Sequence, residues 1–477
     1  MKYTIGELAE IIDGDRGKNY PQQNEFFDSG YCLFLNTGNV TNQGFSFEQN
    51  QFITKEKCDI LRKGKLQRGD IVYTTRGTVG NAAYYSETIE FEHIRINSGM
   101  VIIRPYNTVV DTRFLYQILK SVFYRSYFKQ FCTGSAQPQL PIKNLSKIVL
   151  DIPALAVQNR IADILCAYDD LIENNQKQIK LLEEAAQRLY KEWFVDLRFP
   201  GYENTLIIDG VPQGWKKVSL GELIEYEIGG GWGEDQPTEK CDIPAYVIRG
   251  TDLYDVTHGN AKSIPYRFHA KSNLDSRKLQ DGDIVFEVSG GSKNEGVART
   301  ALITASILDF LGGDVICASF CKLIRFKDKS LAKYMYDTFQ HLRNSGETVK
   351  YDKRSASSIV NYRWKDFLEQ QFIFVPTTDI LTQYNALAEN MQKAIVNKAQ
   401  IIEQSKQARD RLLPKLMSGE IDLFEKKPAE ILQHLPKLSY DEFLSELGMA
   451  ARARTISEAD LRAMYEAYLD DDAEDRD

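Results

Sequence analysis

The chain has 477 residues, of which 43% are hydrophobic and 26% charged, with 31 glycines and only 14 prolines. This composition is typical of soluble globular domains and excludes collagen-like, mucin-like and wholly disordered chains, and at about 150 residues per domain the length predicts two to four domains. The net charge of −8 lies entirely in residues 422–477, which hold 7 basic and 15 acidic residues, so the charge balance of the remaining chain gives no support for a polyanionic partner.

Residues 1–152 predict an α+β domain. They combine short strands over 70–74 and 100–104 with loops rich in Gly, Asn and Thr, and with one helical stretch over 112–130. The basic and aromatic residues at 116–131 favour an amphipathic helix on a core over a helix in a DNA groove.

A long helix is predicted over residues 153–200, directly after Pro153. Its apolar positions alternate at spacings of four and three, the heptad pattern of a coiled-coil seam, with one polar member. The predicted seam consists of Ile161, Leu165, Tyr168, Ile172, Asn175, Ile179, Leu182, Ala186, Leu189 and Trp193.

Residues 201–375 repeat the pattern of the first domain. LQRGDIVY at 66–73 returns as LQDGDIVF at 279–286, and TIGEL at 4–8 returns as SLGEL at 219–223. A closing apolar run ends in Pro153 the first time and in Pro376 the second time. A period above 200 residues is too long for a solenoid and predicts a domain duplication.

A second long helix is predicted over residues 376–421. Its predicted seam consists of Leu387, Met391, Ala394, Lys398, Ile401, Ser405, Ala408 and Leu412. Neither helix is stable alone in water, so each requires a partner, and the two could pack against each other along a seam of about 50 Å. Asn175 and Lys398 are either tolerated, partly solvated seam positions or residues that fix the register of an antiparallel pair. For residues 422–477 we expect two short helices and a disordered acidic end.

Motif searches find no credible active site. The chain contains no Walker A loop, no G-x-S-x-G nucleophile elbow, no H-x-x-x-H pair and no adjacent prolines, and GGGWGEDQ at 229–236 does not match a dinucleotide-binding fingerprint. The seven cysteines include no C-x-x-C pair, and neither a secretory signal nor an apolar run of roughly 18 residues is present. We therefore expect a cytoplasmic, non-catalytic protein with reduced thiols and no bound metal.

Polar loop residues instead predict a recognition surface in each half. Arg pairs with guanine edges, Asn and Gln pair with adenine edges, and Ser, Thr and Lys bind phosphates, although the same residue types are ordinary turn formers. The candidates in the first half are Arg16, Lys18, Asn19, Thr37, Asn39, Arg76, Thr78, Ser135, Gln137 and Gln139. The candidates in the second half are Trp232, Gln236, Arg249, Thr251, Ser292, Lys293, Lys350, Lys353 and Arg354.

Three sequence stretches resemble the specificity subunits of type I restriction–modification enzymes. They are GDIVYTTRGTVG at 69–80 with its partner GDIVFEVSGG, GSAQPQLPIKNLSKIVLDIP at 134–153, and RLLPKLMSGEI at 411–421. The resemblance covers residues 1–421. The second half departs from it by carrying RSASSIVNY at 354–362 where the first carries GSAQPQL, and the tail lies outside it.

The resemblance implies an α+β fold with two target-recognition domains, at 1–152 and 201–375, separated by two conserved spacer helices, at 153–200 and 376–421. Each domain would read one half of a bipartite, asymmetric site on double-stranded DNA, and the helices would dock two methyltransferase subunits, with motor–nuclease subunits joining for restriction. S-adenosylmethionine, ATP and Mg²⁺ are then expected in the partner subunits and no cofactor in this chain.

Two alternatives remain open at this stage. A duplicated coiled-coil scaffold would show the same organisation without reading DNA, and an enzyme with an unfamiliar site would turn over substrate alone. On the recognition hypothesis, we expect Arg16, Arg76 and Gln137 to read one half-site. Arg249, Lys293 and Arg354 are expected to read the other.

Overall fold

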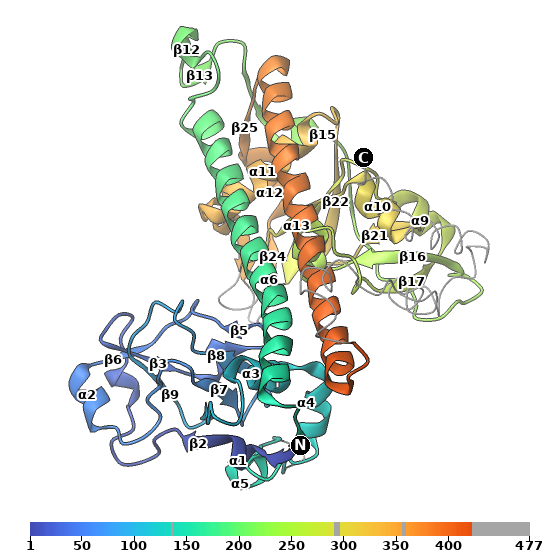
Figure 1. Cartoon of the computed structure of the whole chain (residues 1–477). Coiled ribbons are helices and arrows are strands. Elements are labelled where there is room, and N and C mark those ends of the chain that lie inside the picture. The colour runs from blue at the N-terminus through green and yellow to red at the C-terminus, as the bar shows by residue number, and fades with distance from the viewer. Residues whose placement is uncertain (135–136, 291–295, 355–358, 422–477) are drawn as a thin grey trace, which may run out of the picture. The chain divides into compact units, whose positions relative to one another are not determined.

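The computed structural model describes residues 1–134, 137–290, 296–354 and 359–421 (Figure 1). Its contacts divide the chain into two compact units. Among the described residues, unit 1 comprises Met1–Ile172 and the chain from Gln404 onward, and unit 2 comprises Glu173–Glu403. Helices α6 (Leu155–Tyr190) and α13 (Thr378–Ser418) each contribute one part to each unit. The helices and acidic end expected after residue 421 lie outside the described residues.

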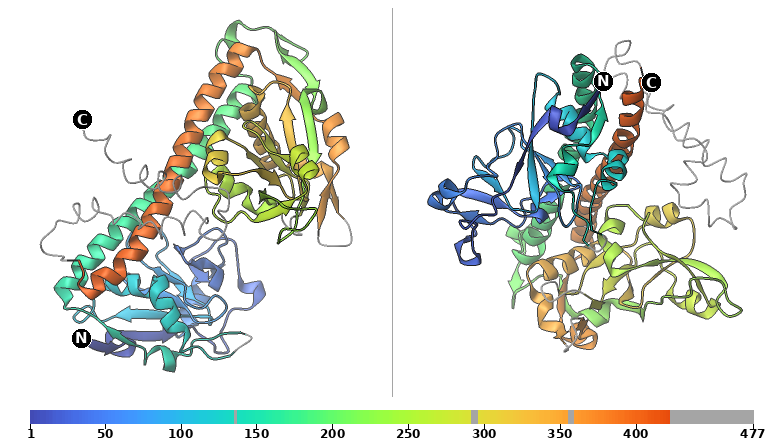
Figure 2. Two further views of the ribbon diagram at one scale, coloured as in Figure 1. Left: turned by 90° about the vertical axis from the view of Figure 1, so that its right-hand side faces the viewer. Right: turned by 90° about the horizontal axis from the view of Figure 1, so that it is seen from below.

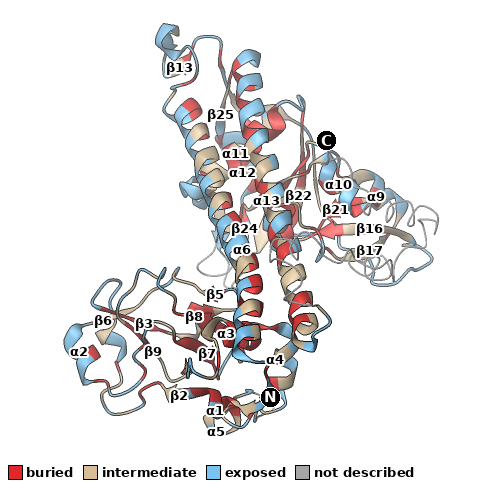
Figure 3. Ribbon diagram, in the orientation of Figure 1, coloured by how far each residue is buried: buried red, intermediate tan, exposed pale blue. Residues whose placement is uncertain are grey.

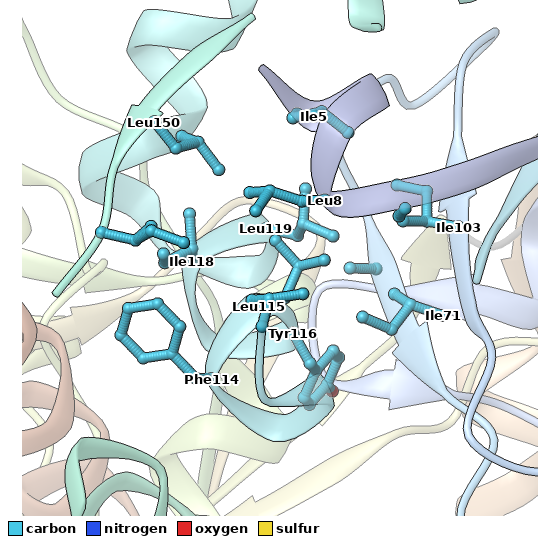
Figure 4. Close-up of a cluster of buried hydrophobic side chains, with 14 of the residues drawn as sticks. Ile5, Leu8, Ile71, Ile103, Phe114, Leu115, Tyr116, Ile118, Leu119 and Leu150 are labelled. Carbon is cyan, nitrogen blue, oxygen red and sulfur yellow. The ribbon is translucent and has the colours of Figure 1, made fainter. Parts of the chain in front are cut away.

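Unit 1 is built on a four-stranded antiparallel sheet in the order β2-β10-β7-β8. These strands are β2 (Ala9–Asp13), β10 (Met100–Pro105), β7 (Ile71–Thr74) and β8 (Ala82–Tyr84). Helix α3 (Thr112–Lys120) packs on the sheet, where its Leu115 and Leu119 share one buried core with Ile71 and Ile103 (Figure 4).

A smaller mixed sheet completes the globular part of unit 1. Strand β3 (Cys32–Leu35) lies between β6 (Phe52–Ile53) and β9 (Ile94–Ile96), and runs parallel to β9. Strand β1 (Lys2–Thr4) pairs with β11 (Val149–Asp151), which brings the chain back to Pro153. The remaining elements are α1 (Ile5–Leu8), the short helix η2 (Thr37–Asn39), β4 (Val40–Thr41), β5 (Gly44–Phe45), α2 (Lys55–Ile60), α4 (Val122–Lys129) and α5 (Ile142–Leu145).

Unit 2 repeats both sheets strand for strand. The antiparallel sheet has the order β15 (Ile224–Gly229), β22 (Cys321–Phe326), β18 (Ile284–Glu287) and β20 (Thr300–Leu302). The mixed sheet has β16 (Ile243–Ile248) between β17 (Tyr266–His269) and the parallel β21 (Val315–Cys317). Strand β14 (Lys216–Ser219) pairs with β25 (Phe372–Val375), as β1 pairs with β11. The predicted α+β duplication is confirmed.

Other elements of unit 2 extend this common plan. Helix α11 (Leu331–Asn344) takes the place of α3, and β19 (Ser289–Gly290), β24 (Val360–Tyr362) and β23 (Asp352–Arg354) form an added sheet. The others are β12 (Ile207–Ile208), β13 (Val211–Pro212), α7 (Leu220–Leu223), α8 (Leu253–Thr257), α9 (Lys271–Arg277), α10 (Ala305–Leu311) and α12 (Trp364–Gln370). Within the described ranges, every helix is too short or too polar to cross a lipid bilayer.

The repeated GDIV sequence forms the same buried turn in both units. Asp70 is 1% exposed, and its carboxylate accepts hydrogen bonds from the Gln67 amide at 2.7 Å and from Arg104 Nε and Nη2 at 2.8 Å each. Asp283 accepts the corresponding bonds from the amide of Gln280 and from the guanidinium of Arg325 at 2.7–2.8 Å. A buried carboxylate needs such partners. In each unit this two-pronged bond between arginine and aspartate, the Arg–Asp fork, ties the turn before β7 or β18 to the neighbouring strand β10 or β22.

The two long helices run antiparallel in unit 2 (Figure 2). There Tyr190 contacts Tyr384, and Ala186 and Gln392 line one cavity. In unit 1, Ile161 and Leu165 of α6 share the core with Leu412 and Leu416 of α13. Each unit therefore buries part of both helices.

The burial pattern of α6 follows the predicted seam, because Ile161, Leu165, Ile172, Asn175 and Ile179 are buried and Leu182 and Leu189 half-buried (Figure 3). In α13, Leu412 is buried and Met391 and Lys398 are half-buried.

The predicted seam is wrong at two positions of α13. Leu387 is 45% exposed and Ile401 is 38% exposed, whereas Ala388 and Ile402 are buried. At both places two apolar residues are adjacent, so the spacing pattern alone does not determine which of them faces inward. The expected helix at 112–130 is also interrupted, because Ser121 is extended and its Oγ caps α4 by accepting a hydrogen bond from the Phe123 amide.

Replacing Arg104 by Ala should lower the free energy of unfolding by about 3 kcal/mol, because the Asp70 carboxylate would remain buried without its charged partner. Chemical denaturation measures the change. Replacing Lys271, which pairs with Asp275 on the surface, should cost less than about 0.5 kcal/mol. Equal losses in the two variants would contradict the structural role assigned to the fork.

The buried imidazole of His258 predicts a pH dependence in unit 2. Burial lowers its pKa, but a hydrogen bond to Glu183 at 3.0 Å and one to the Tyr254 carbonyl at 2.7 Å outweigh it and raise the pKa above the ordinary value. The stabilisation is therefore complete below about pH 6.5 and is lost as the pH rises through the raised pKa. Urea midpoints of the wild type and of His258→Gln should converge above that pKa, and a constant gap from pH 5.5 to 9 would contradict this assignment.

Candidate nucleic-acid interface

Four strand ends of unit 1 meet at one edge. In the main sheet, Asp13 at the end of β2 pairs with Val101, and Thr74 at the end of β7 pairs with Met100 at the start of β10. In the mixed sheet, the parallel strands β3 and β9 end side by side, and the Asn97 amide donates to the Leu35 carbonyl at 3.0 Å. The loops that follow β2, β3 and β7 are therefore gathered around the connection between β9 and β10.

The connection at residues 97–99 holds these loops through hydrogen bonds to its main-chain carbonyls. The Gly99 carbonyl accepts from the amides of Thr75 and Arg76 at 2.9 and 3.1 Å, and the Ser98 carbonyl accepts from Arg16 Nη2 at 3.2 Å. A Cβ at Gly99 would lie 2.8 Å from the Thr37 methyl group, so the η2 loop also packs against this connection. The connection therefore brings together Arg16, Thr37 and Arg76, three of the predicted residues of the first half.

Residues 137–140 join the same surface, because the Leu140 amide donates to the Thr75 carbonyl at 2.9 Å. Arg16, Lys18, Arg76, Thr78 and Gln137 are exposed, and Asn19, Thr37 and Gln139 are half-buried. Ser135 lies outside the described residues. Unit 1 thus presents a polar surface with two exposed arginines.

Asn39 does not belong to this surface. It is 2% exposed, its Nδ2 donates to the carbonyls of Ser46 and Gln49 at 3.0 and 2.9 Å, and its Oδ1 accepts from the Asn36 amide at 3.0 Å. All of its hydrogen-bonding groups therefore hold the loop, so its expected role as a DNA contact is wrong.

Unit 2 has the same main-chain scaffold. The Phe320 carbonyl accepts from the amides of Val288 and Ser289 at 2.9 and 3.2 Å, as the Gly99 carbonyl does from Thr75 and Arg76. The Tyr362 amide donates to the Val288 carbonyl at 2.9 Å, and this bond corresponds to the one from Leu140 to Thr75 in unit 1. The side chains differ, because Phe320, 55% exposed, replaces Gly99.

In unit 2, Arg249 follows β16 as Asn36 follows β3. Its Nε and Nη2 donate to the Asp252 carboxylate at 2.8 and 2.7 Å, and this hydrogen bonding raises the pKa of the guanidinium. Asp252 is buried and accepts a hydrogen bond from the Arg249 amide at 2.9 Å, just as Asn39 accepts one from the Asn36 amide in unit 1. Part of the Arg249 guanidinium is therefore engaged in hydrogen bonds within its own loop.

The other described candidates of unit 2 are exposed. Trp232 is exposed, and the guanidinium of Arg267 lies 4.5 Å from its ring centre. Lys353 and Arg354 are exposed on β23, which is joined through β24 to β19. Gln236, Thr251 and Lys350 are exposed as well. Ser292 and Lys293 lie outside the described residues.

Sequence reasoning missed Ser98, Arg267 and Phe320. None belongs to a motif. Strand pairing places Ser98 next to the ends of β2 and β7 in unit 1, and Phe320 next to the end of β18 in unit 2. Arg267 is identified by its contact with the Trp232 ring. Within the described part of the chain, no group of three or more His, Cys, Asp or Glu side chains is arranged to hold a metal ion. The chemistry that both surfaces offer is hydrogen bonding and positive charge, which suits recognition of a polyanion with polar edges.

Comparison with known proteins supports this interpretation. Residues 1–184 match the sequence model of the type I restriction modification DNA specificity domain. The chain is 27% identical over 378 residues to the MjaIX specificity subunit of Methanocaldococcus jannaschii, covering 75% of this chain and 79% of the relative. It is 30% identical over 199 residues to the HindI specificity subunit of Haemophilus influenzae, covering 40% and 42% of the two chains.

The fold is also shared with a solved structure, the S subunit of a type I restriction–modification system from M. genitalium. The TM-score is 0.51 at 13% identity, and the match covers 87% of this chain and 96% of the other. The resemblance seen in the sequence is confirmed.

Replacing Asn39 by Ala should lower the free energy of unfolding by about 1–3 kcal/mol, because the Ser46 and Gln49 carbonyls would lose their buried donor. Replacing the half-buried Thr37 by Ala should change stability by less than about 0.5 kcal/mol. Thermal unfolding of the two variants measures the difference, and the reverse order would show that the roles of these two residues are interchanged.

Proposed function

The chain is related to the specificity subunits of type I restriction enzymes, and we propose that it directs such an enzyme to a bipartite, asymmetric DNA sequence. The observation that carries this proposal is the repetition of one loop scaffold with two different sets of side chains. In each unit a scaffold fixed by main-chain hydrogen bonds presents a recognition surface. The residues on the two surfaces differ, as Gly99 and Phe320 do, and the two surfaces therefore read different bases.

In unit 1 we assign base reading to Arg76, Arg16 and Gln137. Arg76 fits best, because its backbone is held by the Gly99 carbonyl while its side chain is exposed, which leaves an arginine fork able to meet a guanine edge. Arg16 donates to Asp13 and Ser98, so its guanidinium is already oriented at the same edge. Asn39 is excluded from this set because it is buried.

In unit 2 we assign base reading to Lys293, which lies outside the described residues, and to Arg354, which is exposed on β23 together with Lys353. Arg249 has two of its guanidinium nitrogens bonded to Asp252, so we assign it to a positioned phosphate contact rather than to bidentate base reading.

The chemistry is proposed to reside in partner subunits. Two methyltransferase subunits would dock on the helices α6 and α13, which would set the length of the unread spacer, and motor–nuclease subunits would join for restriction. These partners would hold S-adenosylmethionine, ATP and Mg²⁺. The near-neutral charge of residues 1–421 is compatible with this division, because the partners would supply most contacts to the DNA phosphates.

Co-expression with the cognate methyltransferase subunit, followed by single-molecule sequencing of methylated adenines, tests the proposal. A bipartite motif that requires both chains is the expected result. If a stable complex forms without any methylated motif, the chain is a scaffold that does not read DNA.

Within that assay, Arg76→Ala should relax one base position, which corresponds to a loss of about 1–3 kcal/mol of discrimination. Lys55→Ala is the matched control, because Lys55 is exposed next to β6 at the opposite end of β3. The control should leave both motif and occupancy unchanged. An unchanged motif in Arg76→Ala would remove this residue from the readers.

A further inference from the structure

A buried charge cluster joins the two long helices in unit 1. Asp169 of α6 accepts hydrogen bonds from Gln117 Nε2 at 2.5 Å and Lys120 Nζ at 2.7 Å, both on α3, and from Arg409 Nη1 of α13 at 2.8 Å. Lys120 is buried, and Arg409 is largely buried and also bonds Asp410. Burial raises the pKa of Asp169, but Lys120 and Arg409 outweigh it and hold the pKa below the ordinary value, so the cluster is charged near neutral pH.

The duplication identifies the corresponding positions in unit 2. Helix α3 corresponds to α11 at a displacement of 220 residues, which aligns the buried core residues Leu115 and Met335, and α6 corresponds to α13 at the displacement of 223 that separates Pro153 from Pro376. Gln117, Lys120 and Asp169 then correspond to Asp337, Gln340 and Gln392. The counterpart of Arg409 is Ala186.

All four counterparts meet in unit 2, because Ala186, Asp337, Gln340 and Gln392 line one cavity. The same meeting point of three helices therefore exists in both units. In unit 1 it is filled by an ion pair between α6 and α13. In unit 2 that ion pair is absent, because Gln392 and Ala186 stand where Asp169 and Arg409 stand in unit 1.

This difference decides which helices can pair. Since α6 and α13 are related by duplication, each could in principle pair antiparallel with the same helix of a second chain. In an α6–α6 pair of the same register, Asp169 would meet Ala186 of the second chain. In an α13–α13 pair, Arg409 would meet Gln392 of the second chain. Each self-pair would bury two such charges, one from each chain, without their interhelical partner, which is strongly unfavourable.

We propose that the Asp169–Arg409 contact is a pairing-specificity element that directs α6 onto α13 and disfavours self-pairing of either helix between two copies of the chain. Buried polar residues specify partner and register in coiled coils in the same way, through the cost they impose on the wrong pairing. This proposal concerns helix pairing alone and does not depend on DNA recognition.

The test uses two full-length chains that carry different tags and are refolded together from denaturant. Asp169→Gln/Arg409→Ala installs the residues that unit 2 has at these positions. Mixed-tag dimers, measured by tandem affinity capture and light scattering, should rise roughly tenfold or more over the wild type, the factor that about 1.4 kcal/mol of lost pairing preference gives. The control Glu173→Gln/Lys177→Ala removes an exposed ion pair of α6 and should leave the dimer fraction unchanged.

A second variant keeps the ion pair of unit 1. Ala186→Arg/Gln392→Asp supplies the missing partner in each self-pair, because Asp169 would meet Arg at 186 and Arg409 would meet Asp at 392. Its mixed-tag dimers should rise as well. If either variant folds, as judged by circular dichroism, and forms mixed dimers only at the wild-type level, the proposal is wrong.

Discussion

The candidate interface depends on a few main-chain hydrogen bonds that tie the loops to one short connection between two strands. In unit 1 the Gly99 carbonyl holds the loop after β7, and in unit 2 the Phe320 carbonyl holds the loop after β18. Bonds between main-chain groups do not depend on side-chain identity. The scaffold can therefore persist while the side chains that face outward change, which is what two readers of different half-sites require.

Much of the framework was predictable because it depends on local sequence. The GDIV repeat identified the duplication, and the structure explains the repeat physically. The Asp must be buried to accept the preceding amide and the arginine fork, and Gly69 and Gly282, with φ of +91° and +93°, allow the turn before it. The 4-3 spacing of apolar residues likewise predicted two long helices, because helix periodicity is a property of neighbouring residues.

The site was predictable only in part, because residue type does not determine burial. Thr37 and Asn39 lie in one short helix, yet Thr37 is half-buried at the surface and Asn39 is enclosed by carbonyl groups. Leu387 and Ile401 were misplaced for a related reason, since the adjacent Ala388 and Ile402 satisfy the same pattern. Phe320 is isolated in sequence, and only the pairing of β22 with its neighbours places it at the centre of the edge.

Duplication creates two similar halves, and the residues that differ between the halves are of two kinds. At the surface, Phe320 stands in unit 2 where Gly99 stands in unit 1, while the main-chain hydrogen bonds to the two carbonyls are equivalent. In the interior, Arg409 in unit 1 corresponds to Ala186 in unit 2, so unit 1 has an ion pair that unit 2 lacks. On the proposed function the first kind of difference changes which DNA bases are read, whereas on the pairing proposal the second changes which helices pair. Because the two kinds involve different residues, the outward-facing side chains can diverge while the pairing of α6 with α13 is retained.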